Sequence, residues 1–468
     1  MRASQLETSS NSYRAGKRNR GTHRGQVIFY GLFFVVLIPV CIVGAHAQST
    51  AQFRGNVAHT GVYASAAPKE IGHIAWEFKT GGRVLSSPVI ADGLVFVGSN
   101  DHFLHAIDAT TGREQWKFAT GANVNSSPAV AKGVVYVLSL DGNAYAVEEH
   151  TGKLLWKFQT LGESRLNMAG IYGTVPSREV VPDVWDFLLS SPAVEGDTVY
   201  FGSGDHHVYA LEAATGKLRW RFETGDVVHS SPAIVDGVLY IGCWDGVLYA
   251  LNAKSGGLVW KYATGVDAAH FMQGIPGSAA VVNGIVVFGS RDNFIYALDA
   301  HSGKLIWRQE NGGSWVIASP AIQDGVVYVT TSDSLKLRAL KLETGAQLFD
   351  VGYKAYSFSS PAVAGGHAYF GTFDGAVYDA DLSAKQIHSE FRVQASLAHK
   401  ELLTADGHLN EGVIYGPMGP DSKPNNTIDA SIVSIDRLLQ LGSVLSSPAV
   451  DHGMVFVGSA DGSVYALD

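Results

Sequence analysis

The chain has 468 residues and carries 34 Lys and Arg against 43 Asp and Glu, a formal net charge of −9. Charged residues make up only 16 %, against roughly 25 % in typical soluble proteins, while hydrophobic residues reach 46 %, enough for a large buried core. This composition excludes an intrinsically disordered chain, and the 53 glycines follow no G-X-Y period, which excludes collagen. Neither half of the chain is basic, so the sequence does not favour a nucleic-acid partner.

Residues 1–47 are predicted to lie outside the folded domain. A basic stretch from Arg14 to Arg24 precedes the uncharged apolar run 27–45, and a small-x-small motif for cleavage follows at 45–47. This order is typical of a secretory signal peptide. The alternative is an N-terminal membrane anchor, because a run of 19 uncharged residues is just long enough to span a bilayer. Both interpretations place the protein in an exported compartment, the periplasm or the cell envelope, and the second associates it with the envelope membrane.

Two cysteines are present: Cys41 lies within the predicted signal segment, and Cys243 precedes Trp244 in a strand-like stretch. Cleavage leaves Cys243 alone, so we expect a buried thiol and no intrachain disulfide in spite of the oxidising location. Removal of residues 1–47 leaves 28 Lys and Arg against 42 Asp and Glu, a net charge of −14.

One pattern occurs eight times: Ser-Ser-Pro-Ala-Val, a glycine turn, Val-Tyr-Val-Gly-Ser, Asp-Gly, Tyr-Ala-Leu, Thr-Gly and a tryptophan. The proline position is filled by Pro88, Pro128, Pro192, Pro232, Ala279, Pro320, Pro361 and Pro448. The acidic turn falls at Asp101, Asp141, Asp205, Asp245, Asp292, Asp333, Asp374 and Asp461. A period of about 40 residues with four short strand signals per copy predicts an all-β fold, an eight-bladed β-propeller of four-stranded blades.

The two ends of the chain are predicted to share one blade. The last copy stops at Asp468 after its third strand, and Ile74–Phe78 has the pattern of the missing fourth strand. Joining them closes the ring and leaves no open sheet edge. We therefore assign residues 71–468 to the propeller and residues 48–70 to an N-terminal leader segment.

Three insertions, at about 161–189, 266–276 and 392–444, fall where the outer strand of one blade leads to the inner strand of the next. In a propeller all such joints open on the same face, and long loops gathered on a rigid scaffold commonly build binding sites. The alternative is that they only decorate the surface. The largest insertion contains turn-rich stretches at 416–420 and 423–426, so we expect an irregular lid without a long helix.

Residues three and five positions before each proline position are predicted to line the mouth of the central channel on this face. Aromatic groups with a polar end are favoured at recognition surfaces. Together with polar residues of the insertions, these positions supply the candidate ligand-binding residues Arg165, Asn167, Trp185, His229, His270, Trp315 and Tyr356. The alternative is packing under the loops and loop solvation. We assign no catalytic residue and no metal ligand, because no His-Glu-x-x-His, Gly-x-Ser-x-Gly or phosphate-binding glycine motif occurs.

The segment Asp108–Trp116 and its counterparts in other copies resemble the tryptophan-docking repeat of quinoprotein dehydrogenases. The same PQQ-like repeat occurs in non-catalytic propellers such as the outer-membrane assembly lipoprotein B. Gln52–Gly55 and His59–Gly61 resemble the leader of bacterial PQQ-like repeat proteins. The resemblance covers about 51–468 and implies the propeller fold, but it leaves the activity open because one scaffold carries both enzymes and binding proteins.

Two functions follow from this resemblance. The first is an exported scaffold that binds a protein or small-molecule ligand at one face of the ring. The second is a dehydrogenase that oxidises an alcohol or sugar with PQQ and calcium. In such dehydrogenases Ca²⁺ holds PQQ, which stacks on a tryptophan and is commonly covered by a disulfide between adjacent cysteines. We prefer the binding protein, because the sequence has no Cys-Cys pair, no Cys-x-x-Cys-His motif and no alignable Glu, Asn and Asp set for Ca²⁺.

Overall fold

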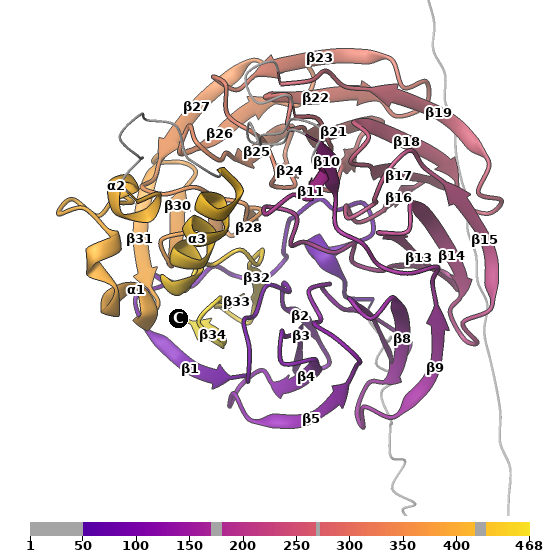
Figure 1. Ribbon diagram of the computed structural model, residues 1–468, viewed down its shortest axis with the longest axis horizontal. Coiled ribbons are helices and arrows are strands. Elements are labelled where there is room, and N and C mark those ends of the chain that lie inside the picture. Colours follow the sequence, from indigo (N-terminus) through magenta and orange to yellow (C-terminus); the bar gives the residue numbers. More distant parts are fainter. Residues whose placement is uncertain (1–49, 170–179, 268–271, 417–426) are drawn as a thin grey trace, which may run out of the picture. The chain divides into compact units, whose positions relative to one another are not determined.

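The computed structural model describes residues 50–169, 180–267, 272–416 and 427–468. These residues belong to one compact unit. Eight four-stranded antiparallel sheets stand around a central axis, and in seven of them the strands follow one another in the order of the chain (Figure 1). The predicted eight-bladed β-propeller is therefore confirmed.

The blades are numbered from the first complete sheet. Blades 1 and 2 are β2 (Val89–Ala91), β3 (Leu94–Gly98), β4 (Phe103–Asp108), β5 (Glu114–Ala119), and β6 (Ala129–Ala131), β7 (Val134–Ser139), β8 (Asn143–Glu148), β9 (Leu154–Gln159). Blades 3 and 4 are β12 (Ala193–Glu195), β13 (Thr198–Ser203), β14 (His207–Glu212), β15 (Leu218–Glu223), and β16 (Ala233–Val235), β17 (Val238–Gly242), β18 (Val247–Asn252), β19 (Leu258–Ala263).

The second half of the ring repeats this order. Blades 5 and 6 are β20 (Ala280–Val282), β21 (Ile285–Gly289), β22 (Phe294–Asp299), β23 (Leu305–Glu310), and β24 (Ala321–Gln323), β25 (Val326–Thr330), β26 (Lys336–Lys341), β27 (Gln347–Gly352). Blades 7 and 8 are β28 (Ala362–Ala364), β29 (His367–Gly371), β30 (Ala376–Asp381), β31 (Gln386–Arg392), and β32 (Ala449–Asp451), β33 (Met454–Gly458), β34 (Ser463–Leu467) with β1 (Ile74–Lys79).

Blade 8 closes the ring by combining both ends of the described chain. Strand β1 pairs antiparallel with β34, with Trp76 opposite Ala466 and Phe78 opposite Val464. The innermost strands contact one another around the axis, and β32 contacts β2. The predicted closure by Ile74–Phe78 is confirmed, and β34 has no open edge.

Neighbouring blades are joined through the repeated tryptophan. Trp220 is typical: its Nε1 donates a hydrogen bond to the carbonyl of Ala253 in the next blade, at 2.9 Å. Its ring covers Gly256, whose φ is +72° and where a Cβ atom would lie 2.6 Å from the indole. Only glycine meets both conditions without strain, which explains why Thr-Gly or Ser-Gly recurs with each tryptophan. In blade 7 the tryptophan position holds Ser389, which is paired with Asp379.

A ring of serines surrounds the central axis. The backbone N–H of each serine that precedes a proline position donates to the hydroxyl oxygen of the equivalent serine in the next blade, at 2.8–3.2 Å. The ring runs through Ser87, Ser127, Ser191, Ser231, Ser278, Ser319, Ser360 and Ser447 and returns to Ser87. These bonds satisfy buried N–H groups that the sheets leave unpaired.

The leader crosses the far ends of the inner strands. Its oxygens accept hydrogen bonds, at 2.7–3.0 Å, from the N–H two residues after the proline position in six successive blades. The pairs are Ala51–Val130, Gln52–Val194, Val57–Ile234, Ala58–Val281, Thr60–Ile322 and Gly61–Val363. Because each inner strand starts at the inserted joints and runs away from them, the leader lies on the opposite face. We call the two sides the insertion face and the leader face.

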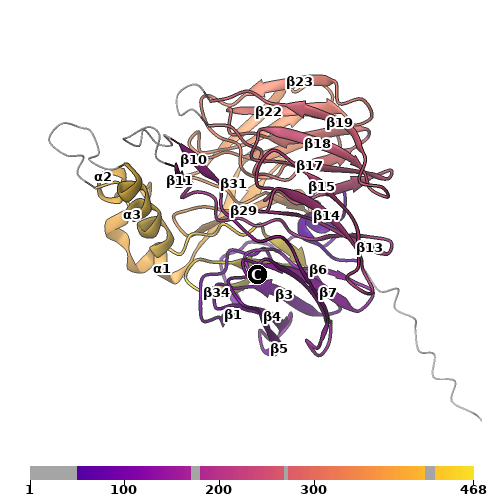
Figure 2. The same ribbon diagram turned by 45° about the vertical axis from the view of Figure 1, so that its right-hand side comes forward.

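The leader contains the 3₁₀ helix η1 (Phe53–Gly55). The insertions add the other elements, which lie on one side of the sheets (Figure 2). They are β10 (Asn167–Ala169), β11 (Val180–Pro182), α1 (Gln394–Ala398), the 3₁₀ helix Lys400–Leu402, α2 (Glu411–Ile414) and α3 (Thr427–Gln440). The expectation of an irregular lid is wrong for the end of the 392–444 insertion, because α3 has 14 residues. Ile435, Leu438 and Leu439 place an apolar stripe on α3 at helical spacing, and this stripe is buried.

Cys243 is free and buried, as expected. No helix in the described residues is long and apolar enough to cross a membrane. The predicted signal or anchor at residues 1–47 lies outside the described residues, and it stays a prediction.

Candidate functional site

The mouth of the central channel is lined by the residues three positions before each proline position. They are Leu85, Asn125, Leu189, His229, Pro276, Ile317, Phe358 and Leu445. Together with the eight serines of the ring, Phe53 of the leader, Leu188 and Gly277, they line a space of about 50 Å³. Such a volume holds a few water molecules at most. Any larger ligand must therefore bind outside the channel itself.

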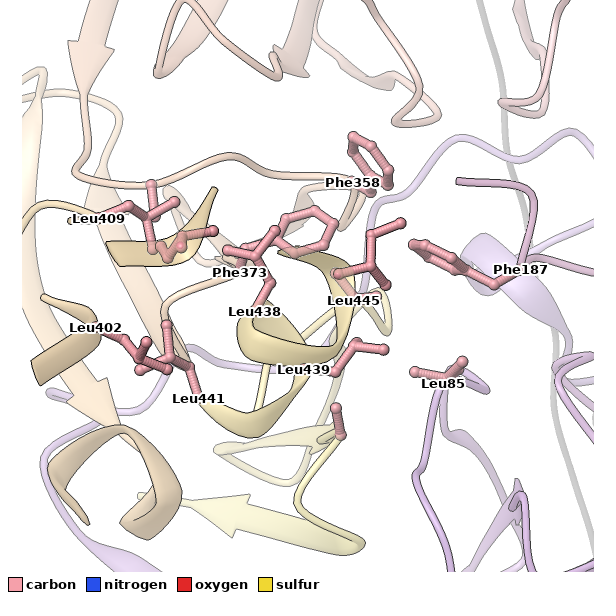
Figure 3. Packing of buried hydrophobic residues seen from close by; sticks show 14 of the residues in the cluster. Leu85, Phe187, Phe358, Phe373, Leu402, Leu409, Leu438, Leu439, Leu441 and Leu445 are labelled. Carbon is pink, nitrogen blue, oxygen red and sulfur yellow. The ribbon is translucent and has the colours of Figure 1, made fainter. Parts of the chain in front are cut away.

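An apolar cluster covers part of this mouth. Leu438 and Leu439 of α3 pack with Phe373 and Leu445 of the blades, as Figure 3 shows. Phe358 and Phe373 meet edge to face with ring centroids 4.8 Å apart. The 392–444 insertion is thus held against the rim by burial of its own apolar stripe, which is the main source of helix stability in a folded protein.

An aromatic pocket opens between the 161–189 insertion, blade 6 and the 392–444 insertion. Its volume is about 300 Å³. The lining residues are Trp185, Gly313, Trp315, Ser332, Asp333, Tyr356, Phe358 and Tyr415. Three predicted ligand-binding residues, Trp185, Trp315 and Tyr356, are thus brought to one place, and each is half-buried.

The phenol groups of the aromatic pocket are linked to α2. Tyr356 donates a hydrogen bond of 2.9 Å to Glu411, and Tyr415 donates one of 3.4 Å to Tyr356. Burial, together with neighbouring Tyr415 and Glu411, raises the pKa of Tyr356. Tyr356 therefore stays a neutral donor, and the pocket offers flat apolar walls with a few hydrogen-bonding groups.

Arg291 connects two of the insertions beside the aromatic pocket. This fully buried guanidinium pairs with Asp183 of the 161–189 insertion, and its Nη2 lies 2.6 Å from the Met272 sulfur of the 266–276 insertion. It also stacks over Trp315, 4.1 Å from the ring centroid. Trp315 in turn donates to Asp267 at 3.2 Å. The predicted gathering of the insertions on one face is confirmed for their described parts.

His229 fastens the 161–189 insertion to blade 4. Its Nδ1 lies 2.6 Å from Asp186 and its Nε2 lies 3.0 Å from Glu163, and all three side chains are buried. Burial alone lowers the pKa of His229, but the charges and hydrogen bonds of Asp186 and Glu163 outweigh it and raise the pKa from 6.5 to about 10. The imidazole is therefore a cation held between two carboxylates, an arrangement that fixes the loop.

Arg165 lies in a second, more polar pocket of about 190 Å³. We call it the α3 pocket; its lining is Arg83, Leu85, Asn100, Asn123, Asn125, Arg165, Val184, Phe187, Ile432, Ile435, Asp436 and Leu439. Asn167 is exposed and donates to the carbonyl of Arg165 at 2.9 Å. The structure thus divides the predicted residues among three places, and His270 lies outside the described residues.

One set of mouth residues escaped the sequence analysis. The residue before each acidic turn reaches the insertion face, and it differs in every blade: Asn100, Leu140, Gly204, Trp244, Arg291, Ser332, Phe373 and Ala460. Ser332 lines the aromatic pocket, Phe373 belongs to the apolar cluster at the mouth, and Arg291 stacks over Trp315. The sequence could have indicated these residues, because their position varies within an otherwise regular repeat. Tyr415 and Glu411 carried no such signal, because they belong to no repeat.

A family model described as "Outer membrane protein assembly factor BamB" matches residues 59–181, 181–275 and 245–388. The chain belongs to this family of PQQ-like propellers. No curated protein sequence matches the chain.

Several solved structures share the fold. The crystal structure of BamB from Moraxella catarrhalis is 15 % identical, with 84 % of this chain and 96 % of that chain covered and a TM-score of 0.58. A europium-containing methanol dehydrogenase is 15 % identical, with 89 % and 98 % covered and a TM-score of 0.59. The quinohemoprotein alcohol dehydrogenase from Comamonas testosteroni is 14 % identical, with 88 % and 79 % covered and a TM-score of 0.60. These similarities show the fold alone.

A quinone cofactor with Ca²⁺ does not fit the described central channel. Its space of about 50 Å³ is far below the about 300–1,000 Å³ of small-molecule sites. Glu163 and Asp186, which lie beside the mouth residue His229, already flank that cation. Ca²⁺ requires six to eight oxygen ligands, and this pair, bound to an imidazolium, does not supply such a set.

Proposed function

We propose that the protein is an exported cell-envelope propeller that binds a segment of a partner protein, or a small-molecule ligand, at its insertion face without catalysis. The aromatic pocket carries this proposal, because five aromatic residues line about 300 Å³ there. Binding sites are concave and mostly apolar, with a few placed polar groups, and occupy about 300–1,000 Å³. The pocket has this character and lies at the lower end of that range.

Exposed apolar side chains around the helices favour a protein segment over a small metabolite. Val413, Tyr415, Ile432 and Val433 are 38–45 % exposed. Apolar groups gathered at a surface and rimmed by polar residues commonly mark interaction sites. Aromatic anchors at such sites contribute most of the binding energy.

The location rests on two observations. The order of charges and apolar residues in 1–47 is that of a signal peptide or anchor. The description of the matching family names an outer-membrane assembly factor, which supports an envelope location and a protein partner.

A random-peptide display library selected on the full-length protein tests the proposal. Selected peptides should bind the Trp315→Ala and Tyr415→Ala variants at least about tenfold more weakly, the loss expected for an aromatic anchor. Tyr262→Ala is the matched control, because Tyr262 is a half-buried tyrosine on the outer strand β19 that lines neither the aromatic pocket nor the α3 pocket.

Two outcomes would contradict the proposal. The first is peptide affinity that does not change in the pocket variants. The second is turnover of an artificial electron acceptor with an alcohol or sugar after PQQ and Ca²⁺ are added, since a dehydrogenase would then be the better description.

A further inference from the structure

A cluster of three potential metal ligands lies at the interface of blades 1 and 2, away from both pockets. Asp92 belongs to the hairpin between β2 and β3, and Glu149 and His150 follow β8. One ligand atom from each residue lies within 4.8 Å of the other two. Asp92 and His150 are exposed, whereas Glu149 is only 1 % exposed.

Glu149 departs from the repeat. The equivalent residues of the other blades with a described turn at this point are Ala109, Ala213, Ala253, Ala300, Leu342 and Leu382. Its backbone has the same role as in the other blades, because the carbonyl of Glu149 accepts the hydrogen bond from the repeated tryptophan, Trp116, at 2.9 Å. The carboxyl group therefore has no part in docking the tryptophan, and a small apolar residue would serve the fold.

The carboxyl group of Glu149 has an unsatisfied oxygen. Its Oε1 is buried and has no hydrogen-bond partner among the described residues. The preceding Glu148 differs, because its carboxylate accepts two hydrogen bonds from Thr151. A buried acceptor without a partner is costly, and a cation between the carboxylates of Glu149 and Asp92 would remove that cost.

We propose that Asp92, Glu149 and His150 bind one divalent transition-metal ion, with zinc fitting best, which joins blades 1 and 2. Carboxylate oxygen and imidazole nitrogen are both zinc ligands, bound at about 2.0–2.2 Å. The exposed side chains of Asp92 and His150 can rotate to close the remaining distance. Three protein ligands at a surface leave a coordination position to water. A single imidazole in the set also favours Zn²⁺ over Ca²⁺ and Mg²⁺, which prefer oxygen ligands alone.

The interface of blades 4 and 5 provides a matched control. It has Asp236 and His301 where blades 1 and 2 have Asp92 and His150, but Ala300 replaces Glu149. Tyr240 also donates there to the carbonyl of Ala300 at 3.0 Å, whereas Phe96 stands at the equivalent position in blade 1. The two interfaces therefore differ chiefly in the buried carboxylate.

Zinc titration of the untagged full-length protein, after chelator treatment and dialysis, tests the proposal. Calorimetry should show one Zn²⁺ per chain, and zinc should raise the unfolding temperature because the ion binds the folded state. Glu149→Ala should weaken zinc binding at least about tenfold and abolish the temperature shift. That variant should fold, since alanine fills the same position in four other blades. The Asp236→Asn/His301→Ala double variant should bind zinc as the unchanged protein does.

Three results would overturn the proposal. Zinc binding that is the same in Glu149→Ala would assign it to scattered surface histidines. Loss of binding in the Asp236→Asn/His301→Ala variant would place the site elsewhere. A larger temperature shift with Ca²⁺ or Mg²⁺ than with Zn²⁺ would show that the class of ion is wrong.

Discussion

A buried histidine on each face of the ring has its pKa shifted, and the two shifts have opposite directions. On the leader face, burial and the nearby charge of Arg54 lower the pKa of His59 to about 3, so this imidazole is neutral. On the insertion face, Asp186 and Glu163 raise the pKa of His229 to about 10, so this imidazole is charged. Both side chains are at most 4 % exposed. The difference comes from the neighbours alone.

The contrast shows how the faces were built. The leader accepts one hydrogen bond from a backbone N–H in each of six successive blades, and this donor requires no particular side chain on the inner strands. The insertion face is held by single, non-repeated contacts such as Arg291 with Asp183 and His229 with Asp186. A surface made of unrepeated side chains is the one that can be specific for a ligand.

The largest effect is expected from removing the leader together with the closing strand. Deletion of residues 48–80 takes away β1 and leaves the hydrogen-bonding edge of β34 unpaired. An open edge of this kind promotes aggregation. We expect insoluble or aggregated protein by size-exclusion chromatography, whereas deletion of residues 1–47 should leave a soluble, cooperatively unfolding chain. A soluble and cooperative 48–80 deletion would contradict the closure.

Replacing the charged histidine should be the next largest change. His229→Leu leaves Asp186 and Glu163 buried without their cation, which costs about 3–5 kcal/mol. Because the folded pKa is raised, the contribution of His229 is fully present below pH 6.5 and is lost as the pH rises through about 10. In the unchanged protein the unfolding midpoint should therefore fall as the pH rises from 6 to 10. In His229→Leu the part of this fall that comes from His229 should be absent.

A methyl group added to a leader glycine should lower the free energy of unfolding. In Gly61→Ala the new Cβ would lie 2.1 Å from the Arg54 guanidinium, at a φ of +65°. Left-handed alanine and overpacking together cost about 2–4 kcal/mol. Gly93→Ala is the control, with a φ of +78° and open space around it, and should cost about 1–2 kcal/mol. Equal losses in denaturant unfolding would show that the leader is not tightly clamped.

His59 should give a stability loss at acid pH. Its pKa is lowered in the folded protein, so its contribution is present above pH 6.5 and declines as the pH falls toward about 3. The loss should approach about 1 kcal/mol per pH unit, near the limit of 1.36 kcal/mol for one proton. His59→Asn should flatten this acid limb, because asparagine tolerates the φ of +57°. An unchanged limb would assign the acid sensitivity to other groups.

The smallest effect is expected in the aromatic pocket. Tyr415 is 38 % exposed, and its hydrogen bond to Tyr356 is 3.4 Å long, so Tyr415→Ala should cost about 0.5–1 kcal/mol of unfolding free energy. Tyr240→Ala at a blade interface is the comparison: this tyrosine is 3 % exposed, and about 3–5 kcal/mol is expected. A large loss of unfolding free energy in Tyr415→Ala would show that the pocket residues contribute to the stability of the fold as core residues do.

Much of the architecture could be predicted because the repeat supplies it. The eight proline positions predicted the blades, and Ile74–Phe78 predicted the closure. Counting back three residues predicted eight side chains that line the channel, whereas residues five positions back, such as Trp315 and Tyr356, line the aromatic pocket instead. Helix α3 was not predicted, because the prolines at 417–424 were taken as evidence against a helix anywhere in the insertion. The apolar spacing of Ile435, Leu438 and Leu439 was already present in the sequence.

The sequence by itself thus determined the blades, their order, the closing strand and the face that carries the insertions, because neighbouring strands and repeated turns depend on local spacing. Only the tertiary structure decided which unrepeated side chains meet. Glu163 lies 66 residues from His229, and Asp183 lies 108 residues from Arg291. A repeat identifies equivalent positions in the blades, but it does not predict which blade residues the side chains of an insertion contact. Contacts between insertions and blades therefore depend on packing and charge in three dimensions.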